Sequence, residues 1–194
     1  MSDDNIVDEG PICMSKLSRR KDKRYSAGVL PYTYFNNTIY FLLGRDRKEE
    51  TWSDFGGKSE QCDNGKAENT ASREFYEETS GSVIDVRTMR DRLQRKKDCR
   101  VIYSKTLNGY QYIMYVVRIP YKDYRNIFLR VFSFIKYVKA HRKFIEKDDI
   151  RWVSMSTLMH GIQEKPLRGS FNINLRPIFQ RTLQNNVRVL TSLS

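Results

Sequence analysis

The sequence has few cysteines and no long apolar run, and each absence excludes a class of protein. Its three cysteines, Cys13, Cys62 and Cys99, are an odd number at irregular spacing, so neither a disulfide framework nor a zinc-binding pattern follows. The most apolar helical stretch, residues 126–138, contains two basic residues. A membrane-spanning helix needs about 20 predominantly apolar residues, so no membrane association is expected.

Targeting features and repeats are also missing. The first nine residues carry three aspartates and one glutamate and no apolar run, so a secretory signal is not expected. The chain has no internal repeat and no low-complexity tract. Its two histidines, His141 and His160, are isolated and receive no catalytic role. These features together favour a cytoplasmic protein.

Positive charge is the strongest feature of the composition. The formal net charge is +12, and 30% of residues are charged against 39% hydrophobic, which is typical of a folded chain. A surface of this kind attracts polyanions, so RNA or a highly phosphorylated small molecule is the expected partner. The alternative is that the basic surface serves solubility alone. No stable protein partner is inferred.

The 194 residues fit one domain, residues 24–194, preceded by a flexible basic arm, residues 1–23. Asn36-Asn37 and Asn108-Gly109 are turn pairs between segments rich in β-forming residues. The patterns predict strands at 25–35, 38–43, 100–105, 110–119 and 150–153, with Pro31 at an edge or irregularity. They predict helices at 67–79, 121–144 and 176–190, and a basic helix or loop at 86–97.

Three carboxylates are spaced so that a helix brings them together. Glu74, Glu77 and Glu78 stand at i, i+3 and i+4, and at about 100° per residue they share one helix face. Like charges this close cost helix stability and are usually offset by cations. Grouped oxygen ligands suit Mg²⁺ or Mn²⁺, ions that neutralise phosphate oxygens and activate water. An ordinary solvated acidic face is the alternative reading.

The sequence around these glutamates resembles the Nudix box, G-x5-E-x7-R-E-U-x-E-E-x-G-U, in which U is apolar. The matching residues are Gly57, Arg73, Glu74, Phe75, Glu77, Glu78 and Gly81. The position of the first box glutamate, counted back from Arg73, holds Gly65, because the loop after Gly57 is two residues longer than in the box. Its substitute is Asp63, Glu60 or Glu68. Ser82 replaces the final apolar residue, and Val83 follows it.

The resemblance covers roughly residues 25–158 and implies both a fold and a reaction. The implied fold class is α/β, a Nudix-type α/β/α sandwich with a mixed sheet, plus a helical insertion at about 121–144 before the last strand. The implied enzyme uses Mg²⁺ or Mn²⁺ to help water attack a phosphorus of a nucleoside diphosphate linked to another group. Glu74, Glu77, Glu78 and Gly57 would bind the metal, and Arg73 would hold the carboxylates in place.

A further carboxylate, Glu146, is a candidate general base. Eukaryotic mRNA-decapping Nudix enzymes have a glutamate six residues before a tryptophan, and Glu146 precedes Trp152 by six. The alternative is that Glu146 and its acidic neighbours only mark a turn between a helix and a strand. The remaining candidates are substrate-binding residues: Trp52 for stacking, and Lys58, Arg45, Lys136 and Lys139 for phosphate groups. A position in the core or on a strand face is the alternative for Trp52.

The positive charge ranks the substrates. The 5′ cap of mRNA, cleaved with release of m7GDP, comes first, and a diphosphoinositol polyphosphate comes second. A small free nucleotide is third, because it gives no reason for so basic a surface. A non-catalytic RNA-binding protein is the alternative that the altered first glutamate suggests. The layout also resembles Nudix proteins of large DNA viruses, to which decapping and diphosphoinositol hydrolysis are attributed, and the host cytoplasm would then be the location.

Overall fold

The computed structural model describes residues 25–95, 97, 99–138, 142–164 and 172–193, with the backbone alone at 142 and 143. The expected arm, residues 1–23, and Lys139 lie outside the described residues. Within the described ranges, no helix is both long and apolar enough to cross a membrane.

The described part of the chain begins with four strands and ends with three helices. The order of the elements is β1 (Tyr25–Phe35), β2 (Thr38–Asp46), β3 (Trp52–Ser53), β4 (Phe55–Lys58), η1 (Gln61–Asp63), α1 (Ala67–Glu78), α2 (Val86–Gln94), β5 (Cys99–Lys105), β6 (Gln111–Arg118), α3 (Tyr124–Tyr137), η2 (Arg142–Ile145), β7 (Lys147–Ser154), α4 (Met155–Ile162), α5 (Pro177–Gln184) and α6 (Val187–Thr191).

The seven strands form one mixed sheet around β1. On one side β1 runs parallel to β6. On the other side it pairs antiparallel with β4 as far as Val29 and with β2 from Tyr32 onward. Pro31 therefore lies where the partner strand changes, as its missing N–H requires. The order is β3-β2-β1-β6-β5, with β4 also on β1 and β7 also on β2.

The turn between β1 and β2 forms as predicted. Asn36 and Asn37 have φ values of 47° and 57°. Positive φ at both central residues gives the turn whose twist matches that of the flanking strands. The hairpin register therefore follows from this asparagine pair, with Phe35 opposite Thr38.

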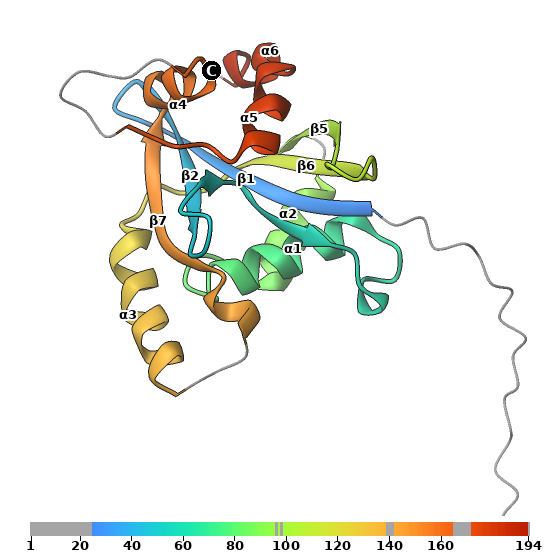
Figure 1. Ribbon diagram of the computed structural model, residues 1–194, viewed down its shortest axis with the longest axis vertical. Coiled ribbons are helices and arrows are strands. Elements are labelled where there is room, and N and C mark those ends of the chain that lie inside the picture. The colour runs from blue at the N-terminus through green and yellow to red at the C-terminus, as the bar shows by residue number, and fades with distance from the viewer. Residues whose placement is uncertain (1–24, 96, 98, 139–141, 165–171, 194) are drawn as a thin grey trace, which may run out of the picture.

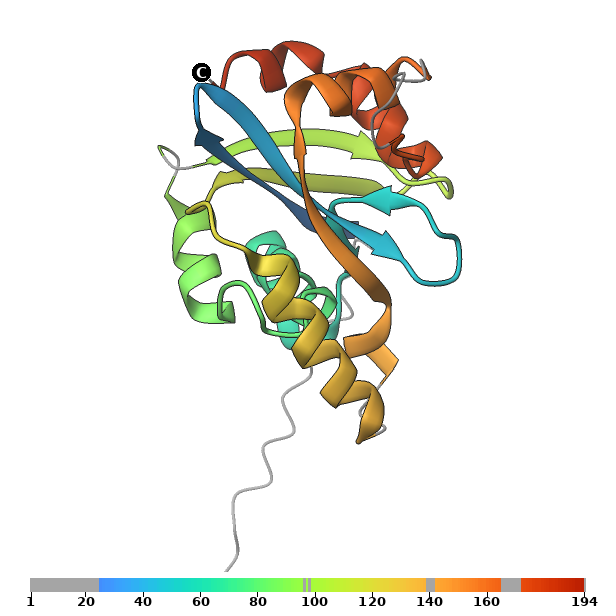
Figure 2. The same ribbon diagram turned by 90° about the vertical axis from the view of Figure 1, so that its left-hand side faces the viewer.

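Helices cover both faces of the sheet. Figures 1 and 2 show α1, α2 and α3 on one side and α4, α5 and α6 on the other. Each layer has its own core, because successive strand residues point to opposite faces. Leu42, for example, packs in the core with Phe75 of α1, whereas Leu43 packs in the core with Phe179 of α5. The predicted α/β/α sandwich with a mixed sheet and a helix before the last strand is confirmed.

Several element predictions need correction. The closing segment is two helices, α5 and α6, separated at Asn185 and Asn186. The sequence pattern also missed α4, β3 and β4, and it began the last strand three residues late. In α3 Phe128 is buried as expected, but Val138 is 49% exposed because the end of the helix extends beyond the sheet.

Candidate active site

The carboxylate helix α1 follows β4 through a short loop. The chain reverses at Asn64 and Gly65, whose φ values are 53° and 67°, a conformation that favours asparagine and glycine. Ala71 and Phe75 are fully buried and fix the helix against the sheet. Beside this buried face, Glu74 and Glu78 approach the backbone of β4, and Arg73 reaches the last residue of that strand.

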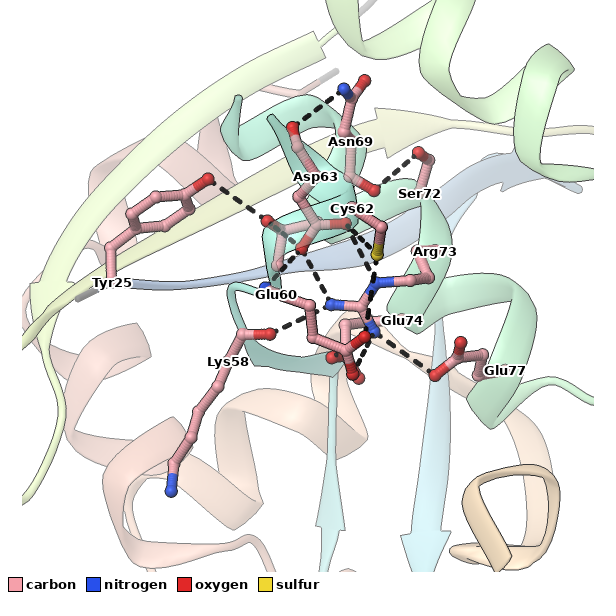
Figure 3. Close-up of polar contacts among 11 residues, drawn as sticks. Tyr25, Lys58, Glu60, Cys62, Asp63, Asn69, Ser72, Arg73, Glu74 and Glu77 are labelled. Atoms are coloured by element: carbon pink, nitrogen blue, oxygen red, sulfur yellow. Dashed lines mark hydrogen bonds and ion pairs between the residues drawn. The ribbon is translucent and has the colours of Figure 1, made fainter. Parts of the chain in front are cut away.

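Arg73 is the centre of the cluster, as Figure 3 shows. Its Nη1 donates to Glu74 Oε1 at 2.8 Å and to Glu77 Oε2 at 3.3 Å. Its Nη2 also donates to the carbonyl oxygen of Lys58 at 3.0 Å, which ties the helix to the end of β4. The Arg73 side chain is only 14% exposed, so these bonds form away from bulk water. One guanidinium thus sets the positions of two glutamates.

Asp63 supplies the carboxylate that holds Arg73 from the other side. Its two oxygens accept from Nε and Nη2 at 3.0 and 2.9 Å, a forked pair typical of arginine and carboxylate. Burial would raise the pKa of Asp63, but hydrogen bonds from Arg73, the Glu60 amide and Thr70 outweigh burial and lower it. Of the other two substitutes, Glu60 is 3.6 Å from Arg73 and half exposed, and Glu68 lies beside Tyr115.

Glu74 lies directly against the backbone of β4. A Cβ atom on Gly57 would be 2.6 Å from the Glu74 carboxyl group, so a larger residue here would displace that carboxyl group. Burial raises the pKa of Glu74 to about 7; the Arg73 charge opposes this rise, and the charges of Glu77 and Glu146 add to it. The glutamate is therefore held where its charged form is poorly solvated.

Glu78 points to a different set of partners. Its Oε2 accepts from the Gly56 amide at 2.8 Å, and its Oε1 lies 3.6 Å from Lys147 Nζ. Burial raises its pKa to about 8, although the Lys147 charge lowers it. The three glutamates share one helix edge, but Glu74 and Glu77 contact Arg73 whereas Glu78 contacts β4 and β7.

Lys147 is a site residue that the sequence pattern missed. Its side chain is 1% exposed, and its ammonium donates to Ser53 Oγ at 2.9 Å. Space for its alkyl chain exists because Gly44, on the neighbouring strand, has no side chain to fill it. The predicted strand began at residue 150, so this lysine fell in an apparently polar turn. Its burial depends on β7 starting at Lys147.

A cavity of about 560 Å³ borders the other face of β4. Asp54 and Tyr112 lie in its wall, and the Tyr112 hydroxyl donates to Asp54 Oδ2. Burial raises the pKa of Asp54 to about 6, while Tyr112 and Lys147 lower it. A Cβ on Gly28 or Gly56 would collide with the Tyr112 hydroxyl, so this glycine pair makes room for it. Since Gly56 also donates to Glu78, one strand separates the glutamates from the cavity.

The side chains at the candidate site are of the type that binds a hard divalent cation. The donors are carboxylate oxygens, which hard divalent cations prefer, and burial raises the pKa of Glu74 and of Glu78 because their charged forms are poorly solvated. Among the described residues, however, no three acidic, histidine or cysteine side chains already stand close enough together to bind one ion.

The other predicted residues lie in varied surroundings. Glu146 is exposed just before β7, and its charge contributes to the raised pKa of Glu74, which places it near the cluster. Lys58 is exposed, and its side chain extends away from Arg73 in Figure 3. Lys136 is exposed on α3, and Arg45 forms a forked pair with Asp148 at 2.8 and 3.0 Å.

Trp52 corrects a sequence interpretation. It is 4% exposed and packs in the core under α4 and α5, with the Arg151 guanidinium 5.6 Å from its ring. A base cannot stack on a ring that is buried in this way. The sequence shows that residue 52 is aromatic but not which face of the sheet its ring lies on. The pairing of β3 with β2 determines that face.

Comparison with known proteins finds distant likenesses. No family model matches the chain. A stretch of 60 residues is 45% identical to the uncharacterized protein L534 of Acanthamoeba polyphaga mimivirus, covering 28% of this chain and only 19% of that protein.

Among solved structures, the fold is similar to Nudix proteins at low identity. The NUDIX domain of Shewanella oneidensis NrtR, complexed with ADP ribose, aligns at 13% identity and a TM-score of 0.48 over 85% of this chain and 87% of that one. A Caenorhabditis elegans Ap4A hydrolase aligns at 14% identity and a TM-score of 0.48, over 87% of this chain and 99% of that one. A putative NUDIX hydrolase from Listeria monocytogenes aligns at 15% identity and a TM-score of 0.42, over 84% of this chain and 95% of that one. Scores this low carry no argument about activity or substrate.

Proposed function

We propose that this chain is a divalent-metal-dependent pyrophosphohydrolase of Nudix type, which cleaves a phosphoanhydride bond in a nucleoside diphosphate linked to another group. The observation that supports this most is the pairing of Arg73 with Asp63 on one side and with Glu74 and Glu77 on the other. A solvated acidic face would leave these carboxylates exposed. Here Glu77 and Glu78 are each 6% exposed, and the Glu74 carboxyl group lies against Gly57.

Each side chain has a role in this proposal. Glu74, Glu77 and Glu78 would hold Mg²⁺ or Mn²⁺, which supplies charge to the phosphate oxygens and lowers the pKa of a bound water. Arg73 is a positioning residue, since its fork on Asp63 fixes where Glu74 and Glu77 lie. Glu146 is exposed beside Glu74 and is free of a side-chain partner among the described contacts, so it is assigned to accept the proton of the attacking water.

The 5′ cap of RNA is the proposed substrate. The wall of the cavity beside β4 includes the aromatic rings of Tyr25, Tyr110 and Phe179, and its polar groups include the Asp54 carboxyl group and Arg176. Apolar walls with a few polar groups are typical of sites for a nucleoside. A net charge of +12 then favours a substrate that continues into a phosphodiester chain. A diphosphoinositol polyphosphate would use the charge but not the aromatic walls.

The test is release of labelled m7GDP from capped RNA by the purified full chain with Mg²⁺ or Mn²⁺. Glu77→Gln is the control, because it keeps the shape of the side chain and removes its charge. Release by the wild type that falls by about 100-fold or more in the variant supports the proposal. Release that persists in Glu77→Gln contradicts the assigned site.

A parallel reaction with an inositol pyrophosphate separates the substrate classes. Cleavage of this compound alone would replace RNA by a small polyanion. No cleavage of either compound, together with tight RNA binding, would favour a binding protein without turnover.

A further inference from the structure

A second cleft, of about 710 Å³, lies away from the carboxylates. Among the described residues its wall includes Arg92, Arg95 and Arg118, with Asp91 as the one acidic residue. Arg92 and Arg118 alone outnumber this carboxylate, so the described part of the wall carries a net positive charge. Within the described ranges, neither Arg92 nor Arg118 forms an ion pair with a carboxylate, since Arg92 donates instead to the carbonyl oxygen of Arg118.

The fold gathers these arginines from separate elements. Thr88, Asp91, Arg92 and Arg95 line the cleft from α2 and its end, and their spacing of three, four and seven residues puts them on one helix face. Arg118 is the last residue of β6. The opposite face of α2 carries the buried Met89 and Leu93, so packing of these two residues aims the basic face outward.

Exposed aromatic rings stand at the same cleft. Tyr34 and Tyr121 belong to its wall and are 47% and 43% exposed. Tyr121 stacks on Phe35, with ring centroids 4.1 Å apart and planes 9° from parallel. Rings of this size are normally buried in a core, so their exposure at a basic cleft points to a planar ligand.

The distance from the candidate active site can be followed along β1. Gly28 pairs with Gly56 beside the carboxylates, and Tyr34, six residues later on β1, lines the cleft. Six residues of strand span roughly 20 Å. A ligand at the cleft and a phosphoanhydride at Glu74 are therefore separate, and a chain of a few nucleotides would connect them.

We infer that this cleft binds single-stranded RNA, with phosphates on Arg118 and Arg92 and a base stacked on Tyr34. Arginine with exposed aromatic rings is the combination that fits a phosphate backbone and its bases together. The inference deepens the proposed function and rests on it in one respect: the bound strand is taken to be the body of the RNA whose cap is cleaved. It assigns a binding site that the carboxylate cluster does not include.

The first experiment measures binding of a short uncapped RNA oligonucleotide to the full chain at several salt concentrations. Arg118→Glu should weaken binding by about ten-fold and reduce the slope of log affinity against log salt by about 0.7 for each phosphate that the variant no longer binds. Arg90→Glu is the matched control, because it makes the same charge change on α2 at a residue that does not line the cleft. Equal effects of both variants would overturn the inference, since binding would then follow net charge alone.

Stacking is tested with Tyr34→Ala and the conservative Tyr34→Phe. The alanine variant should lose about five-fold or more in affinity, and the phenylalanine variant should keep it, because the ring face does the stacking. Inositol hexakisphosphate serves as competitor. If it binds through Arg118 while RNA binding is unaffected by Arg118→Glu, the cleft is a small-polyanion site and the RNA assignment is wrong.

Hydrolysis distinguishes this inference from the proposed function. Arg118→Glu should leave cleavage of a short cap dinucleotide within about two-fold of wild type and raise KM for a long capped RNA, since only the long substrate reaches the cleft. If wild type cleaves neither substrate, the proposed function fails and the binding experiments still decide the cleft. Equal loss on both substrates would mean that Arg118 affects the carboxylate site, and the cleft would not be separate.

Discussion

At the scale of single residues, the candidate site depends on which carboxylate faces Arg73. The sequence did not decide among Asp63, Glu60 and Glu68 as the substitute for the first box glutamate. The lengthened loop shifts the spacing, so counting from Arg73 no longer identifies that position. The turn at Asn64 and Gly65 decides the matter, since it brings Asp63 back toward the helix. The Asp63 carboxylate also accepts hydrogen bonds from the Glu60 amide and the Thr70 hydroxyl.

Asp63→Asn should lower kcat/KM by about 10- to 100-fold, the usual effect of losing a group that positions a ligand. The half-saturating Mg²⁺ concentration should rise with it, because Glu74 and Glu77 lose their fixed neighbour. Glu60→Gln and Glu68→Gln are the matched variants and should stay within about two-fold of wild type. Steady-state hydrolysis at varied Mg²⁺ measures both quantities. A larger loss in Glu60→Gln than in Asp63→Asn would contradict this assignment.

Sequence reasoning found residues whose role follows from spacing along one helix. Glu74, Glu77 and Glu78 come together because helical geometry alone requires it. Lys147, Asp54 and Tyr112 come from three separate parts of the chain, and only the pairing of the strands places them near the cluster. The sequence left Trp52 between stacking and a core position for the same reason, since the face of a two-residue strand has no periodicity to indicate it.

At the scale of elements, Lys147 joins three parts of the fold. It begins β7, donates to Ser53 in β3, and lies 3.6 Å from Glu78 at the end of α1. Such a buried pair costs desolvation, and removal of one partner leaves the other charge unpaired. The connection between helix and sheet is therefore expected to weaken when either charge is lost.

A double-mutant cycle tests this connection. Above pH 8, Lys147→Met should lower the free energy of unfolding by about 2 to 4 kcal/mol, because it leaves the Glu78 charge buried without a cation; in a Glu78→Gln background the loss should be smaller by about 1 to 3 kcal/mol, which is the coupling. Urea unfolding without metal should be run above pH 8, where Glu78 is ionised in the folded chain.

The matched control is the half-exposed pair of Arg45 and Asp148, whose charges are solvated. The cycle with Arg45→Met and Asp148→Asn should give a coupling below about 1 kcal/mol. Equal couplings in both cycles would mean that burial of Lys147 adds nothing to the pair.

The elements themselves were predictable to the extent that they are long and periodic. The hairpin of β1 and β2, the helix α1 and the strands β5 and β6 follow from apolar spacing and turn pairs. The short β3 and β4 have two and four residues. They contain too few positions for a period of two to be read, and they form because β1 and β2 offer them a partner.

At the scale of the whole molecule, pH and metal should act on stability in opposite directions. Burial raises the pKa of Glu78 from 4.5 to about 8 and that of Glu74 from 4.5 to about 7. A carboxyl group with a raised folded pKa stabilises the fold fully below its unfolded pKa, and this contribution is lost as pH rises through the folded value. Asp63 acts in the opposite direction, because its pKa is lowered from 3.8, but it titrates at a pH below the range in which Glu74 and Glu78 titrate.

Metal-free protein should therefore lose stability, on the order of 3 kcal/mol, between about pH 4.5 and about pH 8. Added Mg²⁺ should restore stability most at the alkaline end, because only the ionised carboxylates bind it. Thermal unfolding over this range, with EDTA or with Mg²⁺, measures both effects. Glu78→Gln should show a flatter pH dependence with EDTA and a smaller gain from Mg²⁺. If the EDTA-treated wild type instead becomes more stable toward pH 8, burial does not control these carboxylates, and the cluster is solvated despite its packing against β4.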